Sequence, residues 1–286
     1  MHPCDIAVPG DGIIGATLWQ ASQARALVLI HPATAVTQGF YAAFADYLHS
    51  RGFSVITYDY RGTGRSRGGS LRDCDVSMAD WMELDVGAVT AWAAARFPGL
   101  SLLAVGHSVG GHAIALASGT VLLRAGVLVA CHAGVTATIQ APRERLRVWC
   151  VMRLLAPLLC ALFGYMPGRR LGLGEDLPAA VMLQWSRWSR LPHYFYDDPA
   201  MHAKARAATV AIPLLALGLD DDPWANPHAM DLLLAPLINA AIERRQCHPD
   251  AHPIGHMGFF RKRSAALWPA VADWLCMQAD VHAGAA

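Results

Sequence analysis

A serine stands at the centre of residues 106–110 (GHSVG), after an apolar run and before a stretch rich in small residues. The spacing G-x-S-x-G is typical of a sharp strand-to-helix turn, because glycines two residues either side of the serine avoid clashes of Cβ atoms. Such a turn lifts the hydroxyl above the carboxyl ends of the strands, where backbone N–H groups of the helix also point. Ser108 is therefore a candidate nucleophile, and the alternative is a serine that caps a helix.

A serine hydroxyl is a weak nucleophile at neutral pH and needs a base within hydrogen-bonding reach. Of the thirteen histidines, His256 fits best because it lies in an expected glycine-flanked loop, 253–260 (PIGHMGFF), just before the final expected helix. It also comes late in the chain, as the order serine, acid, histidine requires. Four other histidines are rivals by sequence position but fit less well: His107, His112, His248 and His252.

The acid that orients this histidine is expected after the strand at 213–217, where three aspartates occur at 220–222. Its task is to accept a hydrogen bond from the imidazole and to stabilise the imidazolium. Counting from the start of the strand favours Asp222, whereas counting from the glycine after it favours Asp221. We choose Asp222, keep Asp221 as the alternative, and rank Asp220 third.

The elements that must position these residues alternate between strand and helix, as a parallel sheet requires. Strands are expected at 26–31, 53–58, 100–105, 127–131 and 213–217, after an opening hairpin over 6–19 that turns at 9–12. Helices are expected at 40–48, 78–96, 112–123, 230–242 and 265–277. The fold class is therefore α/β, with a mostly parallel central sheet flanked by helices.

Residues 135–209 interrupt this alternation with helical stretches and Pro/Gly breaks but no convincing buried strand. Because about seventy residues far exceed an ordinary loop, we expect an inserted helical cap or lid between two parts of the core, 1–134 and 210–286. Its apolar segment 148–163 is shorter than the ~20 residues of a membrane span and contains Arg153. A buried or lid helix is the expectation, and peripheral membrane contact is the alternative.

With these residues in view, the sequence resembles the α/β-hydrolase superfamily over nearly its whole length, the lid excepted. Within it, the sequence is similar to bacterial serine hydrolases grouped with esterases, lipases and serine aminopeptidases. The likeness is carried by four segments: 30–34 (IHPAT), 59–66 (DYRGTGRS), the Ser108 turn and the His256 segment.

The resemblance implies that the backbone N–H groups of Ala33 and Val109 form an oxyanion hole. Pro32 replaces the usual glycine and stiffens the first loop, so Thr34 could contribute through its N–H or hydroxyl. The resemblance also implies a structural turn at 59–66, in which Asp59 and Arg61 pair beneath the site.

The resemblance further implies hydrolysis of a carboxylic ester through an acyl-enzyme, with an apolar acyl group of small or medium size. No metal or organic cofactor is expected. An acyltransferase or an aminopeptidase-type amidase would use the same triad, and Glu175 and Asp176 could then bind a substrate amine. A non-catalytic ligand-binding relative would usually lack the nucleophile or the base.

The composition argues against several classes of partner and of binding site. The net charge is +1 and no basic stripe occurs, which argues against nucleic acid as a partner. Seven scattered cysteines without CxxC spacing argue against a zinc or disulfide framework and suit a reducing cytoplasm. The first residues lack the basic and apolar regions of a signal peptide, so a cytoplasmic protein is expected. The oligomeric state is left open.

Overall fold

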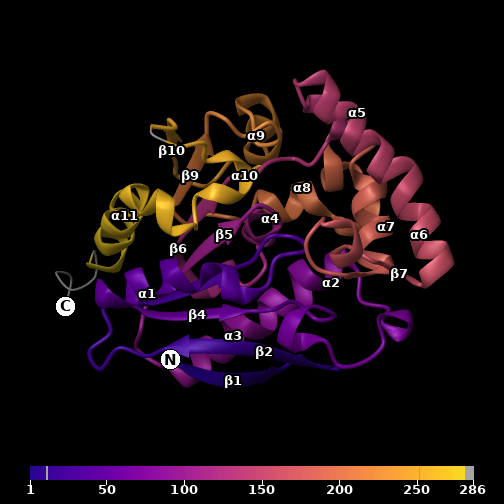
Figure 1. The fold of residues 1–286 in the computed structure, drawn as a ribbon. Coiled ribbons are helices and arrows are strands. Elements are labelled where there is room, and N and C mark those ends of the chain that lie inside the picture. Colours follow the sequence, from indigo (N-terminus) through magenta and orange to yellow (C-terminus); the bar gives the residue numbers. More distant parts are fainter. Residues whose placement is uncertain (11, 251, 281–286) are drawn as a thin grey trace.

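The central element is an eight-stranded sheet in the order β1-β2-β4-β3-β5-β6-β9-β10 (Figure 1). The structure is a computed structural model and describes residues 1–10, 12–250 and 252–280. β2 is antiparallel to β1 and to β4, whereas all other neighbouring strands are parallel. Helices flank this sheet, and the predicted α/β architecture is therefore confirmed.

Each expected strand overlaps an observed one, although β6 begins four residues before the expected 127 and β1 begins four residues before the expected 6, and one edge strand is not predicted. The observed strands are β1 (His2–Ala7), β2 (Ile13–Trp19), β3 (Leu27–His31), β4 (Ser54–Tyr58), β5 (Leu102–His107), β6 (Leu123–Val129), β9 (Leu214–Leu219) and β10 (Ile242–Cys247). β1 and β2 form the expected hairpin, and Asp11 in its turn lies outside the described residues. β3, β4, β5, β6 and β9 are almost wholly buried, because helices cover both faces of the sheet.

β10 is the strand that the apolar pattern does not predict. Its sequence, IERRQC, contains three charged residues and has no fully buried position. β10 pairs only with β9, so it is an edge strand, and charged side chains on an edge hinder pairing with other chains. The helix expected at 230–242 is correspondingly wrong in its second half, because α9 (Pro227–Leu234) ends eight residues before β10 begins.

The helices of the core pack in two groups. α1 (Ala42–Ser50) contacts the last helix, α11 (Trp268–Asp280). α4 (Val109–Ala115) contacts α9 and the π-helical turn Trp81–Asp85, which joins α2 (Met78–Asp80) to α3 (Val86–Arg96) into one long helix, as expected. The small-residue helix starts earlier and ends earlier than expected, because Val109 already belongs to α4 and Leu123 begins β6.

The segment between β6 and β9 is mostly helical. Its helices are α5 (Pro142–Cys150), α6 (Ala156–Phe163), α7 (Ala179–Trp188) and α8 (Ala203–Ala207). A short antiparallel pair, β7 (Tyr165–Met166) with β8 (Leu177–Pro178), joins α6 to α7. Figure 1 shows α5, α6 and α7 standing beside the sheet, on the side where the strands of the core end.

α5, the π-helical turn Val151–Leu155 and α6 form one continuous helix of 22 residues, from Pro142 to Phe163. We call it the α5–α6 rod. Of the two expected possibilities, a buried helix is wrong, since only 17% of its most apolar stretch is buried, whereas a lid helix stays a prediction. The expected helix was also too short, because the arginine-rich turn before residue 148 continues the same helix.

The turn at 59–66 is buried, but its charges pair differently from the expectation. Arg61 donates to Asp85, with Nε 2.5 Å from Oδ1 and the backbone N 2.9 Å from Oδ2. Asp59 instead accepts hydrogen bonds from the backbone and side chain of Gln38. The expected Asp59–Arg61 pair is therefore wrong. The chain folds so tightly over Asp59 that a Cβ on Gly64 would lie 2.4 Å from its carboxylate.

The Arg61–Asp85 pair generates a stability prediction. Burial raises the pKa of Asp85 to about 6, although the charge of Arg61 and its hydrogen bonds act in the opposite direction. Asp85→Asn leaves the Arg61 guanidinium, itself 8% exposed, without this carboxylate, and we expect a loss of about 3 kcal/mol in the free energy of unfolding.

Urea denaturation measures this loss. The matched control is Asp231→Asn, which breaks an ion pair with Arg244 whose two side chains are about half exposed, and this change should have a much smaller effect. Equal effects of the two substitutions would contradict the assigned role of the buried pair.

Candidate active site

Ser108 lies on a strained turn between β5 and α4. Its backbone has φ 52° and ψ −114°, which is rare for a residue with a side chain. A Cβ on Gly106 would lie 2.5 Å from the backbone of Gly111, and one on Gly110 would lie 2.2 Å from the carbonyl oxygen of His31. The glycines either side of Ser108 are therefore required by the close approach of α4 to β3 and β5.

His256 and Asp222 are joined by a short hydrogen bond. His256 Nδ1 donates to Asp222 Oδ2 at 2.6 Å, and both side chains are buried. Asp222 follows the end of β9, and its Oδ1 accepts from the backbone N–H groups of Trp224 (2.8 Å) and Ala225 (3.1 Å). His256 lies in the single turn α10 (Gly255–Gly258) rather than in a loop.

Asp222 is held in its ionised form. Burial by itself raises the pKa of this carboxyl, but the charge and the hydrogen bond of His256 act against burial. The N–H of Trp224 adds to this effect, and so does His132 in the acidic range where it is protonated, so the pKa of Asp222 lies below its usual value. A carboxylate that stays ionised can hold the imidazole in one orientation and stabilise its protonated form.

The other two aspartates of the run have different partners. Asp221 accepts hydrogen bonds at 2.8 Å from the backbone N–H groups of Ile254 and Gly255, so it fixes the segment that presents His256. Asp220 pairs with His248, whose side chain is 77% exposed. The structure thus places Asp222, and neither neighbour, against His256.

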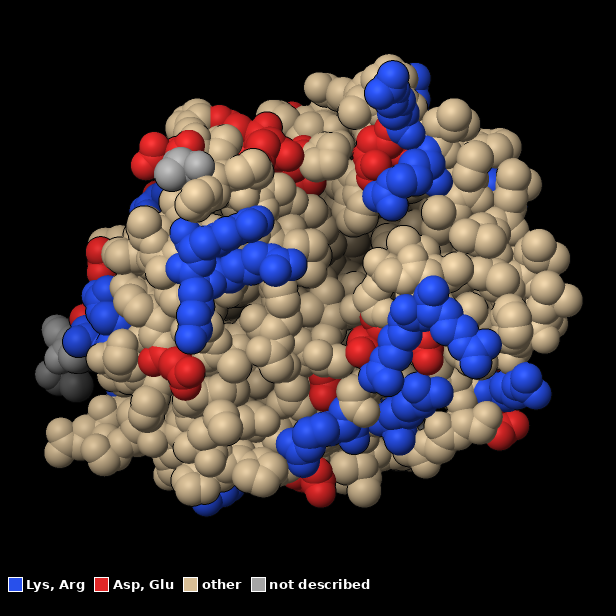
Figure 2. All heavy atoms as spheres, viewed as in Figure 1, with Lys and Arg blue, Asp and Glu red and all other residues tan. Residues whose placement is uncertain are grey.

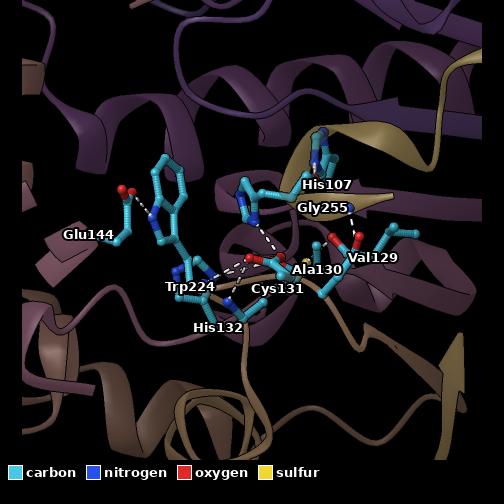
Figure 3. A network of polar contacts seen from close by, with 12 residues as sticks. His107, Val129, Ala130, Cys131, His132, Glu144, Trp224 and Gly255 are labelled. Carbon is cyan, nitrogen blue, oxygen red and sulfur yellow. Dashed lines mark hydrogen bonds and ion pairs between the residues drawn. The ribbon is translucent and has the colours of Figure 1, made fainter. Parts of the chain in front are cut away.

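Two further rings lie against His256, and Figure 3 shows both. The ring centroid of Trp224 is 4.9 Å and that of His132 is 5.4 Å from the His256 centroid. Burial lowers the pKa of His132 to about 4, so it is neutral beside His256 at neutral pH. Trp224 Nε1 donates to Glu144 of α5 at 2.7 Å. Neither ring was expected, although His132 and Trp224 each follow the carboxyl end of a parallel strand, and that position is the available signal.

A buried hydrogen-bond chain connects the loop after β3 to the His256 turn. The N–H of Ala33 donates to the Tyr41 hydroxyl (2.8 Å), which donates to His107 Nδ1 (2.9 Å). His107 Nε2 in turn donates to the carbonyl oxygen of His256 (3.0 Å). Burial lowers the pKa of His107 to about 3, so this histidine is neutral and can donate at one nitrogen and accept at the other. Both ring nitrogens of His107 are thus hydrogen-bonded to groups other than the Ser108 hydroxyl.

The two expected oxyanion donors differ in the hydrogen bonding of their backbone N–H groups. Val109 is the first residue of α4, where backbone N–H groups lack partners within the helix. The N–H of Ala33 is already bound to Tyr41. Ala33, Thr34, Ser108 and Val109 nevertheless line one cavity together with His256.

This cavity has a volume of about 610 Å³. Its wall includes apolar side chains from the segment between β6 and β9, among them Val148, Met152, Trp185 and Tyr194. In the view of Figure 1, the surface of the molecule has a hollow near its centre, and Lys and Arg side chains gather on both sides of it (Figure 2). Among the described residues, no group of three or more His, Cys, Asp and Glu side chains is placed to bind a metal ion.

Comparison with solved structures shows the fold. An esterase from Thermogutta terrifontis is 17% identical over 97% of this chain and 99% of its own, with a TM-score of 0.60. Est1E from Butyrivibrio proteoclasticus, solved with ferulic acid bound, is 15% identical over 96% of this chain and 98% of its own, with a TM-score of 0.63. An esterase from Pyrococcus furiosus is 13% identical over 96% of this chain and 90% of its own, with a TM-score of 0.65.

The curated protein sequences contain no match to this chain. A family model described as "Serine aminopeptidase, S33" matches residues 22–236, which span β3 to α9 and include the Ser108 turn and the aspartate run. This match, together with the mostly parallel sheet and its structural neighbours, shows that the chain belongs to the serine aminopeptidase family of α/β hydrolases.

Proposed function

We propose that this protein is a serine hydrolase that cleaves carboxylic esters with an apolar acyl group of small or medium size. The observation that carries the proposal is the 2.6 Å hydrogen bond from His256 to Asp222 beside a cavity that Ser108 also lines. The esterases among its structural neighbours share its fold and are consistent with this chemistry.

In the proposed reaction, Ser108 Oγ attacks the ester carbonyl carbon while His256 Nε2 takes the hydroxyl proton. The Nδ1–H bond to Asp222 fixes the tautomer that leaves Nε2 as the basic nitrogen. The histidine then gives the proton to the leaving alcohol. A water, deprotonated by the same nitrogen, cleaves the acyl-enzyme and regenerates Ser108.

The oxyanion of each tetrahedral intermediate would be bound by the N–H of Val109 and by a second donor from the loop after β3. Ala33 can supply it only if its N–H turns from the Tyr41 hydroxyl to the substrate. Thr34 is the neighbouring alternative and also lines the cavity. Removal of one such donor typically costs about 10²–10³ in rate.

The cavity wall supports the proposed substrate class. Val148 and Met152 of the α5–α6 rod and Trp185 of α7 give it a largely apolar surface over Ser108. We propose that the segment between β6 and β9 acts as a lid that keeps water from the acyl group.

An aminopeptidase-type amidase is the second candidate, because Glu175 lines the same cavity and could bind a substrate amine. Its carboxylate is already paired with the Arg169 guanidinium, with Oε2 2.6 Å from Nη2. This pairing leaves less negative charge for an amine, and the ester is therefore the favoured substrate.

Labelling with a fluorophosphonate tests the proposed nucleophile. We expect the probe to modify Ser108, as peptide mapping would show, and the His256→Ala variant to react far more slowly because the hydroxyl keeps its proton. The unaltered protein should hydrolyse p-nitrophenyl butyrate and leave alanine p-nitroanilide intact. A folded protein that ignores the probe would overturn the hydrolase proposal, and cleavage of the anilide alone would favour the amidase.

The aspartates offer a matched pair of substitutions. Asp222→Asn should lower kcat for p-nitrophenyl butyrate by about 10³–10⁴, because the amide stabilises the wrong tautomer of His256. Asp221→Asn keeps an oxygen that can accept one of two backbone N–H groups, so we expect a loss of about tenfold or less. Equal losses in the two variants would contradict the assignment.

The hydrogen-bond chain through Tyr41 predicts that this residue positions the groups of the site. This effect can be measured separately from its contribution to the stability of the fold. Tyr41→Phe and Tyr58→Phe each remove a buried hydroxyl from a buried histidine, His107 and His31 respectively. Both should lower the free energy of unfolding by about 1–3 kcal/mol.

Only the Tyr41 hydroxyl connects the loop of Ala33 to the turn of His256, so only Tyr41→Phe should also change kcat. We expect a fall of about tenfold with little change in KM. Thermal denaturation and steady-state kinetics measure the two effects. A similar kcat in the two variants would show that the chain has only a structural role.

A further inference from the structure

The α5–α6 rod presents an apolar surface that nothing in the described chain covers. Met152, Ala156 and Cys160 pack on the body, whereas leucines at spacings of four or eight residues face outward. We call Leu146, Leu154, Leu158 and Leu162 the leucine ridge, and their exposed fractions are 62%, 57%, 57% and 66%. By length and composition alone, with mean hydropathy 1.8 over its most apolar stretch, this helix could cross a membrane.

Cations lie beside the ridge. The rod contains four arginines and a single acid, Glu144, which pairs with Arg147. Arg143, Arg145 and Arg153 are exposed, and none of them has an ion-pair partner among the described residues. The Arg153 guanidinium lies 5.9 Å from the ring centroid of Trp149. The exposed face of the rod is thus both apolar and positively charged.

A shallow groove of about 600 Å³ runs along the same helix. Leu146 and Trp149 form its apolar wall, and the arginines Arg145, Arg153 and Arg190 lie around it, with no acidic residue in the lining. Aliphatic chains suit the apolar wall, and phosphate or carboxylate groups suit the arginines. This combination is complementary to the outer layer of a bilayer that contains anionic lipids.

We propose that the leucine ridge and its arginines form a membrane-docking face, by which the protein binds the surface of an anionic bilayer. Amphipathic helices with Leu and Trp on one side and arginines beside them lie in the interface in this way. Arginines near an anionic surface add about 1 kcal/mol each to binding, which is about a fivefold change in affinity.

The rod lies on the bilayer and does not cross it. A span would place Arg153, near the middle of the apolar stretch, in the hydrocarbon, and would detach Met152 and Ala156 from the body. A second copy of the chain is also a poor occupant. A two-fold contact centred on the rod would bring Arg153 of one copy close to Arg153 of the other.

The docking face is continuous with the cavity. Arg147, Val148 and Val151 of the same helix line the cavity that contains Ser108. An amphiphilic ester could therefore enter the cavity from the bilayer without passing through water. This last step rests on the proposed function, whereas docking itself does not.

Sedimentation with vesicles tests docking without any turnover. We expect the full-length chain to pellet with vesicles of phosphatidylcholine and phosphatidylserine, to bind pure phosphatidylcholine much less, and to be released by alkaline carbonate. Arg145→Gln with Arg153→Gln should lower the partition coefficient for the mixed vesicles about thirtyfold. Leu154→Gln with Leu158→Gln should lower it by about tenfold or more.

The matched control is Val121→Gln with Ile238→Gln, which removes two side chains that are 93% and 73% exposed but lie off the rod. This variant should bind like the unaltered chain, and thermal denaturation should show that all three variants are folded. Hydrolysis of soluble p-nitrophenyl butyrate by the Leu154/Leu158 variant should be unchanged, so a failure to dock and a failure of the proposed function can be told apart.

Four outcomes would overturn the proposal. The chain could stay in the supernatant with both kinds of vesicle, or the control variant could lose binding as much as the ridge variants. The bound protein could resist carbonate, which would indicate a spanning helix. Light scattering could show a dimer that the Leu154/Leu158 variant abolishes while vesicles remain unbound, and the occupant would then be a second copy.

Discussion

A neutral, buried imidazole joins three separate parts of the candidate site. His107 stands next to Ser108 in the chain, accepts from Tyr41 on one side and donates to the backbone of the His256 turn on the other. The same tyrosine receives the N–H of Ala33. These groups come from the ends of β3 and β5 and from the segment after β10. This connection helps to fix their relative positions, together with the pairing of β3 with β5 and the hydrogen bonds between Asp221 and the backbone before His256. Desolvation of His107 keeps it uncharged and so preserves the direction of each bond.

The fold could be predicted because its central strands are continuous apolar runs that are buried on both faces. Much of the candidate site follows from the same pattern, since the carboxyl ends of parallel strands meet at one edge of the sheet. This rule places Ser108 and Asp222 at that edge. The contact between Asp222 and His256 favours Asp222 over its neighbours, which spacing alone does not separate, because Asp221 instead binds the backbone before His256.

Other features depend on side-chain packing that the sequence pattern does not contain. Arg61 pairs with Asp85, which belongs to a distant π-helical turn, and the tight turn over Asp59 prevents the local alternative. β10 is charged because it is an edge strand, so it lacks the apolar pattern of the others. The occupied N–H of Ala33 could not be foreseen either, since it depends on where the tyrosine hydroxyl of a neighbouring helix points.

The contact between Glu144 and Trp224 makes the environment of His256 sensitive to the position of α5. Glu144 belongs to α5, yet its carboxylate accepts a hydrogen bond from the indole that packs at a tilt against the imidazole. A displacement of α5 by the width of one side chain would release the indole and admit solvent to the histidine. The hydration of the His256 ring thereby depends on where α5 lies.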